Sequence, residues 1–153
     1  MAVIERDRGW KKIKLEMAKA HRKEVAVGIL EGSVNPEGLS IAEYAMYNEF
    51  GTENVPARPA NAMAFDENVG EINLDFQKQH EAIIEGRQTA QGALTVIGMR
   101  HAARVQNAIT DRDILPRLAP STVAAKKGST KTLVDTGAMV NAVNISVRGR
   151  GQS

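Results

Sequence analysis

Apolar residues fall on every second position in two short stretches of the chain, residues 24–31 and residues 143–148. Their main apolar members are Val25, Val27, Ile29, Val143, Ile145 and Val147. Because side chains along a strand point alternately to opposite faces, a period of two predicts a strand with one apolar face. We expect the first strand to be largely buried and the second to be half buried. We also expect the two to pair in one small antiparallel sheet.

Spacings of three and four between apolar residues predict helices in much of the remaining chain. One stripe lies in residues 10–20, another in 69–83 and a third in 90–108. The stripes comprise Trp10, Ile13, Met17, Ala20, Val69, Ile72, Phe76, His80, Ile83, Ala90, Leu94, Ile97, His101, Val105 and Ala108. Gly86 is the expected break between the last two, and short helices are expected over 121–127 and 136–142. The third helix is rich in Gly and Ala, so its backbone can lie close to a neighbour in the same chain or in another copy.

These elements predict a single α+β domain over residues 1–153, in which a small antiparallel sheet packs with several helices, one or two of them long. A chain of 153 residues can bury a core without cross-links, and it contains no cysteine for disulfide or thiolate chemistry. No apolar run approaches the ~20 residues that cross a bilayer, so we expect no membrane partner.

Residues 40–59 predict a packed corner between two helices. Ser40 and Glu43 form a capping box that opens the first helix, and Gly51 ends it because glycine tolerates a positive φ. Pro59 suits the first turn of the second helix, where no amide donor is needed. The expected buried stripe of the first helix is Ile41, Tyr44, Ala45, Tyr47 or Asn48, and Phe50. We interpret the following residues as fixing this corner or forming an interface on it: Tyr44, Phe50, Gly51, Pro56, Arg58 and Pro59.

The charge of the chain is small overall but unevenly distributed. The formal net charge is +2, and residues 114–134 contain no acidic residue. The basic residues in that segment are Arg117, Lys126, Lys127 and Lys131. We predict a flexible basic loop here. Two interpretations remain open, a solvated loop or an arm that meets an acidic partner surface or nucleic acid.

Asp135, Thr136 and Gly137 follow two apolar residues and resemble the active-site turn of retroviral-type aspartic proteases. In those enzymes two such carboxylates share a proton across a dimer axis. That fold also needs strands, a flap and a second structural turn downstream, which the surrounding pattern does not predict. We therefore favour a structural role, in which Asp135 or Thr136 caps the short helix that follows.

Other candidate chemistry is sparse. His21, His80 and His101 lie on separate predicted helices, and no pair of them has metal-ligand spacing. We expect His80 and His101 to be hydrogen-bonded core residues. A helix-turn-helix over residues 41–66 would need a basic second helix, but only Arg58 there could reach a phosphate. The sequence predicts no catalytic site, metal or cofactor.

Two motifs, in this order, resemble virion assembly proteins of tailed bacteriophages: the small neck and tail proteins called tail-completion, head–tail joining or minor tail proteins. The first motif, over residues 44–59, is Tyr-Ala, then Asn-Glu-Phe-Gly-Thr, then Val-Pro-Ala-Arg-Pro. The second is Leu-Val-Asp-Thr-Gly-Ala-Met over residues 133–139, preceded by Ala-Pro-Ser-Thr-Val-Ala over 119–124. One departure follows the first motif, where Ala60, Asn61 and Ala62 replace the family's usual large apolar residue.

The resemblance implies a structural virion protein rather than an enzyme. Such a protein assembles with itself as a ring, commonly sixfold, between the portal–connector and the tail tube. Its other partners would be connector- or portal-side and tail-tube proteins, and basic residues lining the ring could meet genomic DNA in transit. It would be located in the virion, after assembly in the host cytoplasm. The alternatives from other classes are a dimeric aspartic protease using Asp135 and, more weakly, a DNA-binding regulator dependent on Arg58.

Overall fold

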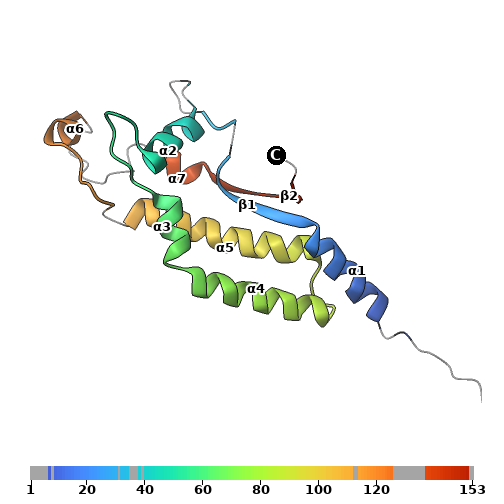
Figure 1. Ribbon diagram of the computed structural model, residues 1–153. Coiled ribbons are helices and arrows are strands. Elements are labelled where there is room, and N and C mark those ends of the chain that lie inside the picture. The colour runs from blue at the N-terminus through green and yellow to red at the C-terminus, as the bar shows by residue number, and fades with distance from the viewer. Residues whose placement is uncertain are drawn as a thin grey trace, which may run out of the picture.

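The computed structural model describes residues 7, 9–30, 32–34, 38, 40–111, 114–125 and 137–151. In chain order its elements are α1 (Trp10–His21), β1 (Lys23–Ile29), α2 (Ile41–Phe50), α3 (Ala60–Asp66), α4 (Val69–Ile84), α5 (Ala90–Asp111), α6 (Pro120–Ala125), α7 (Ala138–Asn141) and β2 (Val143–Gly149). The predicted α+β class is confirmed, with an antiparallel pair of strands and a long helix, α5, of 22 residues. Figure 1 shows an elongated molecule, with α1 toward one end and α2 and α6 toward the other.

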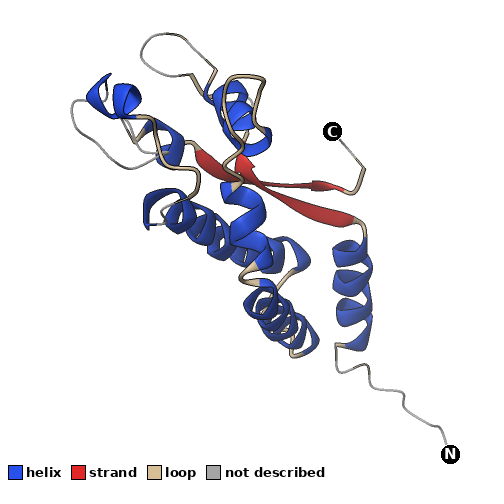
Figure 2. Ribbon diagram, turned by 60° about the vertical axis from the view of Figure 1, so that its left-hand side comes forward, coloured by secondary structure: helices blue, strands red, loops and turns tan. Residues whose placement is uncertain are grey.

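The two predicted strands do pair with each other. Lys23 pairs with Gly149 and Ile29 with Val143, so β1 and β2 are in antiparallel register over their full length. Both strands contact α5, which runs beneath the sheet (Figure 2). Most residues of β1 are only half-buried, so this strand is less buried than its apolar sequence predicts. The physical reason is that a two-stranded sheet has no central strand, and each strand therefore keeps an edge.

The close approach predicted for the small residues of α5 occurs at Gly98, where the helix meets the sheet. A Cβ atom built on Gly98 would lie 2.6 Å from Cγ2 of Val25 and 3.4 Å from Cγ2 of Ile145. The strands therefore rest directly on the helix backbone at this point. Gly98 serves a contact inside the chain, between elements that lie far apart in the sequence.

The main core lies where α2, α3 and α7 meet the second half of α5. Val105 is its most deeply buried large side chain, and Ala60 and Ala64 of α3 pack with it. The other buried members are Ile41, Ala108, Ile109, Ile114, Met139 and Val143. Many of these residues are small, so the helices approach one another closely.

Helices α4 and α5 form a hairpin around the predicted break at Gly86, which has a φ of 73°. Asp75 of α4 is buried, and its carboxylate accepts hydrogen bonds from Arg104, at 2.8 Å, and from Arg100, both on α5. Burial alone would raise the pKa of Asp75, but the hydrogen bonds from Arg104 and Arg100 outweigh it and lower the pKa below its ordinary value. The hairpin is thus held by a charged network that apolar periodicity did not predict.

Two histidine predictions have different outcomes. His80 was expected in the core, and this is wrong, because α4 packs through the face that carries Ile72 and Asp75 and leaves His80 and Phe76 exposed. His101 is half-buried and meets the ring of Phe65 edge-on, with the ring centroids 6.0 Å apart. Its buried Nδ1 has no hydrogen-bond partner among the described residues, so the expected hydrogen bond is not found at this atom. Burial, and then the charge of Arg104, lower the pKa of His101, which favours its neutral form.

Helix α1 packs differently from its predicted apolar stripe. Trp10 was expected to be buried but is 59% exposed, while Glu16 is buried instead. The Glu16 carboxylate accepts a hydrogen bond from the backbone N–H of Ala90, at 2.9 Å, and one from Nζ of Lys19, at 2.6 Å. Hydrogen bonds from Lys19 and from this amide lower the pKa of Glu16. The reason for the difference is that α1 abuts the N-terminus of α5, whose free N–H groups attract a carboxylate.

Candidate interaction surface

The predicted corner begins with a capped helix. The Ser40 hydroxyl oxygen accepts a hydrogen bond from the N–H of Glu43, at 3.2 Å, which is half of the predicted capping box. The helix ends where the N–H of Gly51 donates to the carbonyl of Tyr47, at 2.9 Å. Gly51 has a φ of 76° and a ψ of 172°. Its positive φ was predicted, but its ψ directs the chain away from the helix rather than into a left-handed turn.

Backbone hydrogen bonds hold the return from Gly51 toward α3, one within the segment and one to α2. The N–H of Thr52 donates to the carbonyl of Val55, at 2.7 Å, and the N–H of Arg58 donates to the carbonyl of Asn48, at 2.5 Å. The Asn48 side chain is buried and donates to the carbonyl of Tyr44, at 2.9 Å. The corner is therefore fixed mainly by polar contacts of the main chain.

Glu49 joins α2 to α3 and was not singled out in the sequence. Its two carboxylate oxygens accept hydrogen bonds from the backbone N–H groups of Asn61, at 3.0 Å, and Ala62, at 2.9 Å. These are free donors at the start of α3, where the helix dipole also favours negative charge. Pro59 is the N-cap residue of α3, one position before the first turn where it was expected. One sequence signal could have suggested this cap. It is an acid shortly before the glycine that ends one helix, followed by a proline at the start of the next helix.

Arg58 is buried, with 6% of its surface exposed. Its Nε donates to the carbonyl of Pro116, at 3.0 Å, and so connects the corner to the segment after α5. Arg58 therefore contributes to the fold, as interpreted from the sequence. Pro56 is exposed and lies in the return toward α3.

The aromatic residues of α2 are not packed in the core. Phe50 is 78% exposed and Tyr44 is 47% exposed, so the predicted buried stripe is wrong for both. The buried residues of α2 are Ile41 and Asn48, and the Asn48 side-chain amide donates a hydrogen bond to the carbonyl of Tyr44. We call the exposed outer side of the helix the α2 face. It consists of Glu43, Met46, Tyr47 and Phe50.

A groove of about 470 Å³ lies beside this face. Its walls include Tyr44 and Tyr47 of α2, Arg58, and Arg117 and Leu118 from the segment that leads to α6. The Tyr47 hydroxyl donates to the Glu43 carboxylate, at 2.6 Å, and this hydrogen bond raises the pKa of Tyr47. The tyrosyl ring is thereby held against the helix while one side remains open.

The remaining predicted residues have mixed outcomes. Gly137 precedes α7, with a φ of 73°. Lys126, Lys127, Lys131 and Asp135 lie outside the described residues, so neither the basic loop as a whole nor the protease hypothesis is tested. The described part of that loop, residues 114–125, includes the buried Ile114 and helix α6. Among the ranges that the structure describes, no three His, Cys, Asp or Glu side chains come together as metal ligands.

The described helices include none that is both long and apolar enough to cross a membrane. No protein-family model, curated protein or solved structure matches this chain. The surface formed by the α2 face and the adjoining groove is the feature of the described structure with the clearest capacity for binding.

Proposed function

We propose that this protein is a structural virion protein that forms a ring at the head–tail junction or tail end of a tailed bacteriophage. The observation that carries the proposal is the α2 face, which presents large apolar side chains to solvent on a rigidly held helix. The proposal also draws on the resemblance of residues 44–59 and 133–139 to phage neck and tail proteins.

The physical argument for an interface is that large apolar side chains are unfavourably exposed to water. Exposed apolar patches on a helix that is fixed in place are typical of surfaces that another protein covers. Met46 and Phe50 are 51% and 78% exposed, and burying the part of each that is still exposed would contribute on the order of 1–2 kcal/mol. The main chain that carries these two side chains is held in place, because Glu49 caps α3 and Arg58 anchors the return segment. A pre-organised surface loses little entropy when a partner binds.

In the assembly that we propose, copies of the chain contact one another in a closed ring, commonly sixfold in proteins of this kind. The ring contacts connector- or portal-side proteins on one side and tail-tube proteins on the other. Basic residues that face the central opening would make transient, salt-sensitive contacts with the genome as it passes. The protein's role in this proposal is mechanical, without a catalytic residue or cofactor.

Native mass spectrometry and negative-stain electron microscopy of the purified protein test whether it forms rings. We expect closed rings whose population rises with protein concentration. Phe50→Ser should lower that population, whereas the matched control Leu74→Ser, at a 52% exposed position on α4, should not. A protein that stays monomeric at all concentrations would refute self-assembly.

The place of the ring in the virion needs a separate experiment. When the gene for this chain is interrupted in the phage that carries it, electron micrographs of the lysate should show filled heads and unattached or incomplete tails. Complete, infectious particles in that lysate would refute the proposal.

A further inference from the structure

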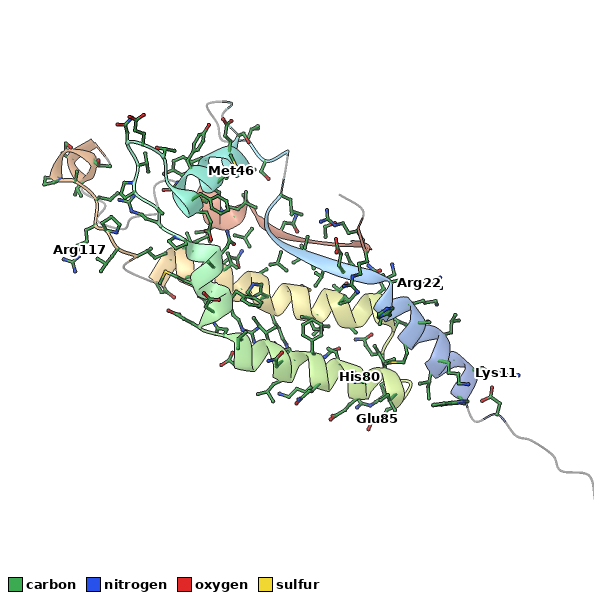
Figure 3. All side chains as sticks on the ribbon, viewed as in Figure 1. Lys11, Arg22, Met46, His80, Glu85 and Arg117 are labelled. Carbon is green, nitrogen blue, oxygen red and sulfur yellow. The ribbon has the colours of Figure 1, made fainter. Side chains whose placement is uncertain are left out.

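Helix α1 and the corner formed by residues 41–57 differ in the charge of their side chains. The segment from residue 10 to residue 23 holds one carboxylate, Glu16, which is buried against α5. Its basic residues are Lys11, Lys12, Lys14, Lys19, Arg22 and Lys23. At the other end, residues 41–57 contain three glutamates and no Lys or Arg. Figure 3 shows Lys11 and Arg22 at one end of the long axis and Met46 toward the other.

Helix α1 presents its basic residues on one outer side. Lys11 and Leu15, one turn apart on α1, and Arg22, the C-cap residue, are all exposed, and they lie away from the side that carries the buried Glu16. We call this side the α1 face. Leu15 is 55% exposed, and Trp10, over which Lys14 lies at 5.2 Å from the ring centroid, adds a second apolar group at the edge. The α1 face therefore combines positive charge with exposed apolar surface.

The α2 face has the complementary composition. Glu43 is exposed on the same outer side as Met46 and Phe50, and Glu53 is exposed in the return segment beyond Gly51. Met46 and Phe50 supply apolar surface of the kind that Leu15 and Trp10 could cover. Each face shows one sign of charge in its exposed acidic and basic residues, so a face paired with its own copy would place like charges together.

We infer that the α1 face of one copy docks on the α2 face of the next copy, so that the chain associates head to tail. This inference rests on the proposed ring and specifies its repeating contact. The occupant of the α2 face is a second copy, because the α1 face of the same chain supplies the positive charge and the exposed apolar side chains that complement it. Contacts between two different patches generate rings when the rotation between copies closes, and open filaments when it does not. The opposite placement of the two faces allows this geometry, since each copy can use both at once.

Charge reversal provides a specific test. One variant carries Lys11→Glu and Arg22→Glu on the α1 face. The other carries Glu43→Lys on the α2 face and Glu53→Lys in the return segment beside it. Each variant alone should need at least about tenfold more protein than the wild type for half-maximal assembly, because attractive pairs become repulsive. An equimolar mixture should recover assembly, since the reversed α1 face of one variant complements the reversed α2 face of the other. Sedimentation velocity measures all three samples.

Control experiments distinguish a failure of the proposed ring from a failure of the head-to-tail contact. Lys78→Glu, at an exposed position on α4, should assemble like the wild type, and circular dichroism should show that each variant is folded. If the wild type does not assemble at all, the proposed ring is refuted, and this inference with it. If the wild type assembles and the two reversed variants assemble equally well, or if mixing them restores nothing, only the head-to-tail contact is refuted. If the α1 variant loses binding to duplex DNA but assembles normally, the α1 face binds nucleic acid instead.

Discussion

Gly51 is the residue whose replacement should damage the corner most. Its φ of 76° and ψ of 172° lie in a region that is essentially restricted to glycine, and a residue with a Cβ atom there costs about 1–3 kcal/mol. A Cβ atom at Gly51 would also lie 2.8 Å from the backbone nitrogen of Ala57 and 3.0 Å from the carbonyl oxygen of Val55. Neither contact is with a flexible side chain, and the overpacking adds about 1–3 kcal/mol.

We therefore expect Gly51→Ala to lower the free energy of unfolding by about 2–6 kcal/mol, and Gly51→Val to lower it by more. For a domain of this size that corresponds to a fall in Tm of roughly 4–24 °C. Urea denaturation followed by circular dichroism at 25 °C measures the change.

Gly70→Ala is the matched control for this measurement. Gly70 lies in the first turn of α4, and no atom lies within 4 Å of a Cβ built there. This substitution should leave stability unchanged or raise it by up to about 1 kcal/mol. An unfolding free energy for Gly51→Ala within 0.5 kcal/mol of the wild type, roughly the range expected for an ordinary surface change, would show that our account of the corner is wrong.

Other substitutions test the helix and sheet contacts. Asp75→Asn should lower the free energy of unfolding by about 3 kcal/mol at pH 7, because it leaves Arg104 without its buried carboxylate. The folded-state pKa of Asp75 is lowered, so its stabilisation is complete above its unfolded pKa of about 4 and is lost as the pH falls further. The difference in free energy of unfolding between Asp75→Asn and the wild type should therefore be smaller at pH 3 than at pH 7. If urea denaturation gives the same difference at both pH values, this prediction is wrong. Gly98→Ala should cost about 1–3 kcal/mol through its clash with Val25, and unchanged thermal unfolding would contradict that contact. Arg58→Met should cost about 1.5–3 kcal/mol by removing the hydrogen bond to Pro116, whereas equal chemical denaturation curves would refute an anchoring role.

The regular elements were predictable because their periodicity is strong. The strand alternation around Val25 and Ile145 gave both the existence and the pairing of the sheet, since an apolar strand requires a partner. The two long helices followed from stripes that contain Ile72 and Ile97, both of which are buried. Turns at Gly51 and Gly86 followed from the freedom of glycine to adopt positive φ. In these cases the local pattern gives the type and place of the element, although Val69, Phe76 and His80 of the α4 stripe are exposed.

The buried charges were not predictable in the same way. Glu16 and Asp75 are buried because their partners, the Ala90 amide and the Arg104 guanidinium, are brought to them by packing. Those partners lie 74 and 29 residues away, so no local pattern indicates the pairs. An amphipathic pattern predicts each acid to be at the surface. Hydrogen bonds formed in the tertiary structure instead allow both carboxylates to be buried.

The exposure of the α2 face was not predicted, and the cause is the apolar character of its side chains. Apolar residues on a short helix are ordinarily taken as core, and Tyr44 and Phe50 were assigned there. A residue that is meant to contact another molecule has the same apolar character as one that packs within its own chain. Only the position of Asn48, which takes the inward side of α2, reveals that Phe50 points outward. Sequence alone does not distinguish these two uses of an aromatic side chain.

The pairing of β1 with β2 has a consequence for synthesis on the ribosome. Lys23 pairs with Gly149, so β1 emerges early in translation and its partner strand emerges more than 100 residues later. The α4–α5 hairpin lies between them and makes contacts that are close in sequence, which favours its earlier formation. Until β2 arrives, β1 contacts only helices, chiefly α5 at Gly98 and, to a smaller extent, α1 and α2. The sheet therefore closes only after more than 100 further residues have been translated, and a chain interrupted before β2 lacks the strand that completes it.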